Sequence, residues 1–127
     1  MQLLWVAVGG AIGATARYLL GGLIHRFTSP FFPYGTLTVN LVGCFLFGIV
    51  IGLADERFVI GPTGRVFLLI GVLGGFTTFS TYTYETLQLL RDGELGRALV
   101  NMGGQVVGGL VVLWAAYVGV RAIAQVP

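Results

Sequence analysis

Apolar residues form four long runs along the chain, separated by short links that carry most of the charged residues. The runs cover about residues 3–24, 35–53, 64–90 and 98–120. Each is close to the roughly 20 apolar residues that cross the hydrocarbon core of a bilayer as a helix. The pattern predicts an all-α membrane protein in which residues 1–127 form a single transmembrane domain of four helices.

The composition supports lipid as the solvent of this chain. Of its 127 residues, 56% are hydrophobic and only 9% are charged, whereas soluble domains carry about 25% charged residues. The 21 glycines are more than twice the usual share of roughly 7%, and small residues let membrane helices approach closely. A net charge of +2 is too small to suggest nucleic acid as a partner.

Glycine spacing and the N-terminal residues add two expectations. Residues 1–5 contain no basic side chain, so we expect the first run to be a retained helix rather than a cleaved signal. Glycines that are four residues apart share a helix face and predict close packing. Such pairs are Gly9 and Gly13, Gly48 and Gly52, and Gly104 and Gly108.

The arginines in and beside the links show no bias between the two sides of the membrane. Cytoplasmic loops normally carry an excess of Lys and Arg, which sets the orientation of the chain. With four spans, three arginines fall on each side: Arg57, Arg65 and Arg121 against Arg26, Arg91 and Arg97. A chain without this bias is expected to insert both ways, which favours an antiparallel homodimer over a chance balance.

The third run contains a segment that is poorly suited to a helix centre. Residues 74–85 read GGFTTFSTYTYE, and glycines followed by β-branched residues weaken a helix. Backbone opened at membrane depth has to line a cavity or be buried in protein, and freed carbonyls there coordinate cations in transporters. Gly74 and Thr77 are well placed to present such carbonyls. A glycine kink satisfied by Ser and Thr hydroxyls, without an ion, is the alternative.

Aromatic and hydroxyl side chains follow this segment. Phe79 and Tyr82 are three residues apart and share a helix face, with Ser80 and Thr81 beside them. The positive edge of an aromatic ring attracts an anion, and hydroxyl donors replace part of its hydration shell. Ordinary helix packing is the alternative for an aromatic pair at this spacing.

Other polar residues within the runs are few. Asn40 lies in the second run, and Asn101 and Gln105 lie four residues apart in the fourth. Intramembrane amides hold helices together, or donate to an anion where they face a pore. Arg17 and Glu85 lie inside the first and third runs, where a charge needs water or a partner.

Three motifs, in this order, resemble the Fluc (CrcB) family of fluoride channels. They are GGAIGATARY at residues 9–18, GTLTVN at 35–40 and GGFTTFST at 74–81. The resemblance implies passive export of fluoride from the cytoplasm by an antiparallel, dual-topology homodimer in the cell inner membrane, with two pores. It also implies a structural Na⁺ at the dimer centre, held by the backbone carbonyls of Gly74 and Thr77 of both subunits.

The resemblance further implies roles for individual side chains. Asn40 and Phe79 line the pore, Ser80 and Thr81 form a hydroxyl track, and Arg17 and Glu85 are vestibule charges. Tyr82 stands where the family has its second pore phenylalanine, which leaves the pore width open. Gly109 and Leu113 stand at positions that are hydroxyls in some relatives, so Asn101 or Gln105 are candidates for that part of the path.

Two other functions and one other assembly are alternatives to a homodimeric channel. A dual-topology multidrug exporter needs a membrane-embedded carboxylate, but Glu85 is the one acid within the runs and lies near an end. A non-conducting subunit of a larger membrane complex would use the broken helix for packing alone. A pair of different, oppositely inserted chains is the alternative to a homodimer. No phosphate-binding loop, nucleotide motif or catalytic constellation indicates an enzyme.

Overall fold

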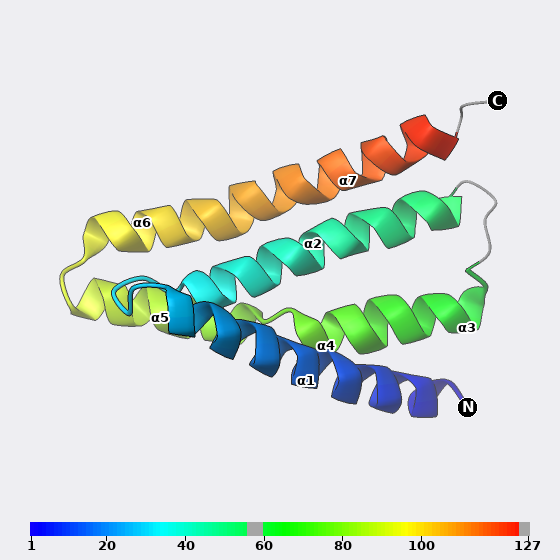
Figure 1. Cartoon of the computed structure of the whole chain (residues 1–127), viewed down its shortest axis with the longest axis horizontal. Helices are drawn as coiled ribbons and strands as arrows, with labels where there is room; N and C mark the ends of the chain where they lie inside the picture. Colours follow the sequence, from blue (N-terminus) through cyan, green and yellow to red (C-terminus); the bar gives the residue numbers. More distant parts are fainter. Residues whose placement is uncertain (56–59, 125–127) are drawn as a thin grey trace.

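The computed structural model describes residues 1–55 and 60–124, and all the regular structure in these residues is helical. Four stretches of them are long and apolar enough to cross a membrane: Gln2–Phe27, Tyr34–Asp55, Pro62–Arg91 and Leu95–Ala124. The stretches run side by side, and the start of the first stretch lies at the same end as the end of the last (Figure 1). This confirms the predicted all-α architecture with four spans.

The first two spans are continuous helices, whereas the last two are subdivided. They are α1 (Gln2–Phe27) and α2 (Tyr34–Asp55). The third span comprises α3 (Pro62–Arg65), the π-helical segment η1 (Val66–Leu73), α4 (Gly74–Phe76) and α5 (Phe79–Arg91). The fourth comprises α6 (Leu95–Gly103), the π-helical segment η2 (Gly104–Gly108) and α7 (Gly109–Ala124). Each helical stretch extends a few residues beyond the predicted run.

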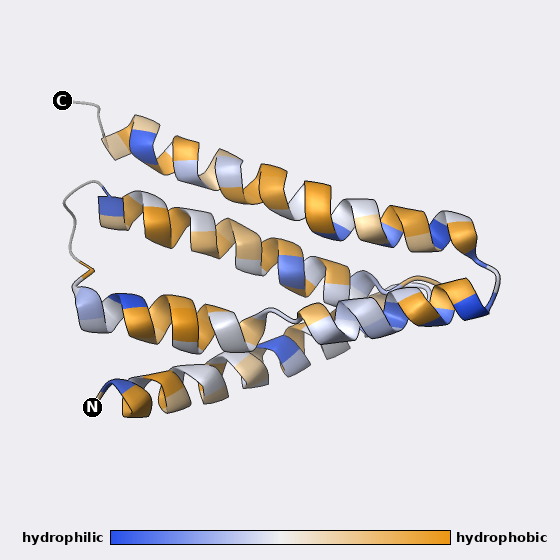
Figure 2. Cartoon of the chain, turned by 180° about the vertical axis from the view of Figure 1, so that it is seen from behind, coloured by the Kyte–Doolittle hydropathy of each residue, from blue (hydrophilic) through white to orange (hydrophobic). Residues whose placement is uncertain are grey.

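Hydropathy follows this architecture. The spans are covered mostly by apolar residues, and hydrophilic residues gather at the helix ends and along α5 (Figure 2). Of the arginines used in the orientation argument, Arg57 lies outside the described residues.

Glycines bring the helix backbones into direct contact. A Cβ atom on Gly9 would lie 2.8 Å from the carbonyl oxygen of Phe67, and one on Gly13 would overlap the carbonyl oxygen of Val72. One on Gly75 would lie 2.7 Å from the carbonyl oxygen of Gly10. Helix α1 therefore packs on η1 and α4 without intervening side chains, which is the geometry that small residues permit in membranes.

The other two predicted glycine pairs also lie at packing faces. Gly48 and Gly52 of α2 face the backbone and side chains of α7, while Gly104 and Gly108 face leucine side chains of α2. The expectation that all three pairs mark packing surfaces is confirmed.

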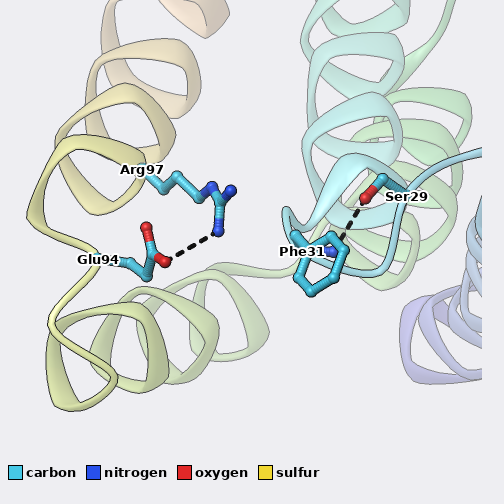
Figure 3. A network of polar contacts seen from close by, with 4 residues as sticks. All are labelled: Ser29, Phe31, Glu94 and Arg97. Atoms are coloured by element: carbon cyan, nitrogen blue, oxygen red, sulfur yellow. Dashed lines mark hydrogen bonds and ion pairs between the residues drawn. The ribbon is translucent and has the colours of Figure 1, made fainter.

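Two links meet at the end of the bundle away from the start of α1 and the end of α7 (Figure 1). Arg97 pairs with Glu94 at 3.1 Å and lies over the ring of Phe31, 5.6 Å from its centroid. The Phe31 N–H donates to Ser29 Oγ at 3.3 Å (Figure 3). These contacts connect the α1–α2 link to the start of α6. Because the ion pair is half exposed, it adds little stability by itself.

The glycine contact between α1 and the third span leads to a first prediction. Gly13→Ala places a methyl group against the Val72 carbonyl, so we expect a loss of about 1–3 kcal/mol of stability, the usual cost of overpacking. Thermal unfolding in detergent, followed by circular dichroism, measures this as a lower midpoint.

The matched control for this prediction is Gly22→Ala on the same helix. A Cβ on Gly22 would meet no atom within 4 Å among the described residues, so the midpoint of this variant should equal or exceed that of the parent protein, because alanine favours a helix over glycine. Equal midpoints for the two variants would contradict the close backbone contact at Gly13.

Candidate functional site

The helix of the third span is interrupted at Thr77 and Thr78, just after Gly74 and Gly75. Thr77 (φ −81°, ψ 154°) and Thr78 (φ −145°, ψ 112°) are extended. Gly74 is helical (φ −64°, ψ −36°), and Gly75 also lies in α4. The break was predicted in this segment, but the β-branched residues open and the glycines do not, because Gly75 packs on the Gly10 backbone.

The extended residues divert two backbone amides from the helical ladder. In a continuous α-helix, the amides of Thr78 and Thr81 would bond the carbonyls four residues earlier, those of Gly74 and Thr77. Instead, the Thr78 N–H donates to Asn40 Oδ1 at 2.8 Å, and the Thr81 N–H donates to Thr78 Oγ1 at 3.3 Å. The carbonyls of Gly74 and Thr77, which the sequence predicted as cation ligands, therefore lack the N–H partners that a continuous α-helix would give them.

The Arg17 guanidinium approaches one of these carbonyls, that of Thr77. Its Nη1 lies 3.5 Å from the Thr77 oxygen, beyond the usual 2.7–3.2 Å of a good N–H···O bond. Gly74 is exposed at the surface of the single chain. Both oxygens therefore keep most of their capacity to bind another partner.

A new helix N-terminus begins at the centre of the span. Thr78 caps α5 by accepting the Thr81 N–H, and its own hydroxyl donates to Thr81 Oγ1 at 2.9 Å. Helix N-termini carry a partial positive charge and unpaired N–H groups, so they favour anions.

Asn40 holds the opened backbone from the neighbouring helix. Its Oδ1 accepts the Thr78 N–H at 2.8 Å, and its Nδ2 donates to the Thr78 carbonyl at 3.0 Å. The side-chain amide thus pairs with both the N–H and the carbonyl of one residue, as a neighbouring β-strand does. The second Nδ2 hydrogen goes to Gln105 Oε1 at 2.8 Å. The amide of Asn40 thus replaces the ladder bonds that Thr78 has lost.

The aromatic pair beyond the break lines a cavity of about 320 Å³ together with Asn40, Thr78 and Gln105. The rings of Phe79 and Tyr82 meet edge to face, with centroids 5.4 Å apart and an interplanar angle of 64°. Tyr82 is buried, but Phe79 is 73% exposed. A large ring at mid-span therefore projects from the single chain next to the cavity.

The charged residues predicted for a vestibule meet in a second, larger cavity of about 940 Å³. Its walls include Arg17, Thr81 and Glu85, and Thr78 lines both cavities. The predicted site residues therefore gather around the break, although Ser80 is exposed and belongs to neither cavity wall.

Sequence reasoning missed the partners of Glu85. Its Oε1 accepts the Thr36 hydroxyl at 2.7 Å, while Oε2 is buried without a hydrogen bond to any described residue. His25 lines both the larger cavity and a neighbouring one with Glu85, although nothing in the sequence gave it a role. Thr36 and Glu85 are 49 residues apart, and no local pattern links them.

Comparison with known proteins identifies relatives over nearly the whole chain. The profile of the family described as "CrcB-like protein, Camphor Resistance (CrcB)" matches residues 4–117. The fluoride-specific ion channel FluC of Opitutus terrae is 46% identical over 117 residues, covering 91% of this chain and 89% of the relative. The FluC proteins of Methylobacillus flagellatus and Acidobacterium capsulatum are 44% and 40% identical over 125 residues, or 98% of this chain.

The contact between Asn40 and Thr78 leads to a second prediction. Asn40→Leu keeps the side-chain size but leaves the Thr78 N–H and carbonyl without their partners. We expect a stability loss of about 1–3 kcal/mol for each unsatisfied group and faster hydrogen exchange at the Thr78 amide. Hydrogen–deuterium exchange mass spectrometry of a peptide containing residues 77–82 measures the second effect.

Cys44→Ala serves as the matched control for this variant. Cys44 lies four residues further along α2 and lines the same cavity, but it contributes no hydrogen bond within the described part of the chain. Its exchange should match the parent protein. Unchanged exchange in Asn40→Leu would mean that Asn40 does not hold the break.

Proposed function

The chain belongs to the CrcB family, whose relatives at 40–46% identity are named fluoride-specific ion channels, and from this we propose that it is a passive, fluoride-selective channel. In this proposal it exports fluoride from the cytoplasm across the cell inner membrane. An inside-negative potential favours exit of the anion by about 2.3 kcal/mol per charge for each 100 mV. The relatives are named as channels, and the family is not one of enzymes.

One observation carries the proposal: the aromatic cavity lies beside a helix N-terminus at mid-span. The ring edges of Phe79 and Tyr82 and the start of α5 offer partial positive charge to an anion. No lysine or arginine lines this cavity among the described residues. Partial charges replace the hydration of a small anion without holding it as tightly as a fixed cation would, which suits conduction.

We propose that a second copy in antiparallel orientation completes the pathway and gives two equivalent pores. The exposed ring of Phe79 supports this, because a ring that lines a pore needs a facing wall that one chain does not supply. The even division of arginines between the two ends supports insertion in both orientations.

We also propose a structural Na⁺ between the two copies, held by the carbonyls of Gly74 and Thr77. The donor set fits, because both oxygens are neutral, hard ligands whose α-helical donors are bonded to side chains. Gly74 is exposed, so a second copy can approach it. When bound, the ion would supply the positive charge that satisfies these carbonyls and links the copies.

The remaining site residues take the following parts in the proposed path. Arg17 and Glu85 provide the charges of the wide cavity through which the anion reaches the break. Thr81 and Ser80 offer hydroxyls near the start of α5. Tyr82 contributes its ring edge next to Phe79.

The function is tested by fluoride efflux from liposomes. Purified protein is reconstituted into vesicles loaded with potassium fluoride, and valinomycin is added so that potassium carries the balancing charge. A fluoride electrode should record rapid release, and a chloride electrode should record almost none from matched chloride vesicles. Equal release of both halides, or no release of fluoride, would contradict the proposal. A multidrug exporter or a non-conducting assembly subunit would then be the alternatives.

Two variants at the aromatic pair serve as internal controls for this test. Phe79→Ile removes the ring edge from the cavity and should lower fluoride release roughly ten- to hundredfold, the effect of losing one strong contact to an ion. Tyr82→Phe keeps the ring edge and should retain release. Loss of flux in both variants would point to general disruption rather than to aromatic edges.

The dimer and its ion lead to a separate prediction. In sodium-containing detergent buffer, light scattering should give a protein mass twice that of the 13.5 kDa chain. Exchange into a buffer with only N-methyl-D-glucamine as cation should lower the dimer fraction at low protein concentration, and added Na⁺ should restore it. A monomeric mass in sodium buffer would contradict the dimer. To remove a tightly held ion, the protein is unfolded and then refolded without Na⁺. If its dimer fraction is then the same with and without added Na⁺, the proposed Na⁺ site is wrong.

A further inference from the structure

A chain of amide groups leads from the break into the fourth span. Asn40 Nδ2 donates to Gln105 Oε1 at 2.8 Å, and Gln105 Nε2 reaches Asn101 Oδ1 at 3.5 Å. Asn101, which is completely buried, donates through Nδ2 to Thr86 Oγ1 at 2.9 Å. The Thr86 hydroxyl donates to the Tyr82 carbonyl at 2.8 Å. The chain thus starts at α5 and returns to it.

The direction of every bond in this chain is set by one backbone group. The oxygen and nitrogen of an amide side chain are assigned from their partners, but a backbone N–H can only donate. Because the Thr78 N–H points at Asn40, the Asn40 oxygen must face it and the Asn40 nitrogen must face Gln105. Gln105 therefore turns its oxygen toward Asn40 and its nitrogen away.

The side-chain amides of Asn40 and Gln105 differ in how many of their hydrogens have an acceptor. Asn40 uses one Nδ2 hydrogen on the Thr78 carbonyl and the other on Gln105, so none is left. Gln105 Nε2 also carries two hydrogens. Within residues 1–55 and 60–124 it has one acceptor, Asn101 Oδ1, at a long 3.5 Å.

The spare donor lies at the aromatic cavity. Gln105 is half buried and lines this cavity with Phe79 and Tyr82. Asn101, by contrast, is fully buried and is not part of the cavity wall. Of the two amides that line the cavity, Gln105 is the one with a hydrogen that has no acceptor within residues 1–55 and 60–124.

We propose that Gln105 supplies an amide N–H that binds the anion in this cavity and thereby helps to select fluoride. The inference rests on the proposed channel function and refines its site. Asn40 orients Gln105 and holds the extended backbone at Thr78. The long bond to Asn101 leaves the Gln105 nitrogen free to lean toward an anion while its oxygen stays on Asn40.

The first test replaces Gln105 by a side chain of similar length without donors. Gln105→Met should lower fluoride efflux from valinomycin-treated liposomes roughly ten- to hundredfold, the range expected for losing one hydrogen bond to a charged group. Gln2→Met makes the same chemical change at the exposed first residue of α1 and should leave efflux unchanged.

A second variant separates donation to the anion from support of Asn40. In Gln105→Glu, the carboxyl accepts from Asn40 in both its neutral and its ionised form, but only the neutral form has an O–H to donate. Fluoride efflux of this variant should fall as the pH is raised from about 5.5 to about 8.5, a range in which buried carboxyls titrate. The leak of protein-free liposomes is subtracted at each pH, and the parent protein is measured over the same range.

These outcomes separate the inference from the function on which it rests. Parent-like efflux in Gln105→Met, or efflux of Gln105→Glu that follows the parent at every pH, would overturn the role of Gln105 while leaving the channel intact. Absence of fluoride efflux in the parent protein would instead overturn the channel. If Gln105→Met does not fold, as judged by its elution and circular dichroism, the pH response of Gln105→Glu decides alone.

Discussion

Opened backbone in the middle of a membrane span is the constraint on which the rest of this structure depends. Each unpaired N–H or carbonyl at that depth costs several kcal/mol, so the extended Thr77–Thr78 pair requires substitute partners. Asn40 supplies two of them and Thr78 itself caps α5. Because Asn40 belongs to α2, satisfying the break also fixes the position of α5 relative to that helix.

Close backbone packing makes the break possible at a defined place. The first half of the third span is held against α1 by glycines, with Gly13 and Gly75 in direct contact with backbone atoms of the facing helix. That half cannot move without losing these contacts, so the change of direction falls on the residues that follow it. The same packing explains why glycine, which is unfavourable in soluble helices, stays helical at position 75.

The sequence predicts the four spans, the interrupted third run and most residues around the break, because these follow from local hydropathy and helix propensity. The position of the break within the motif did not follow, since the packing of Gly75 on Gly10 is a tertiary contact that overrides propensity. The partnership of Thr36 with Glu85 joins residues 49 positions apart. The amide spacing of Asn101 and Gln105 was visible, but which of their atoms face Asn40 depends on a backbone N–H of another helix.

Opening one helix at mid-span creates two adjacent helix ends of opposite partial charge, one suited to a cation and the other to an anion. The half that ends at the break presents carbonyl oxygens, the negative end of its dipole, while the half that begins there presents N–H groups, the positive end. In the proposed channel, the first end would hold a cation and the second would meet the anion. The side chains then adjust these fields. Asn40 pairs with the N–H and carbonyl of Thr78, and Gln105 keeps one hydrogen without an acceptor among the described residues. A neutral cavity can in this way attract fluoride without a fixed charge that would hold it in place.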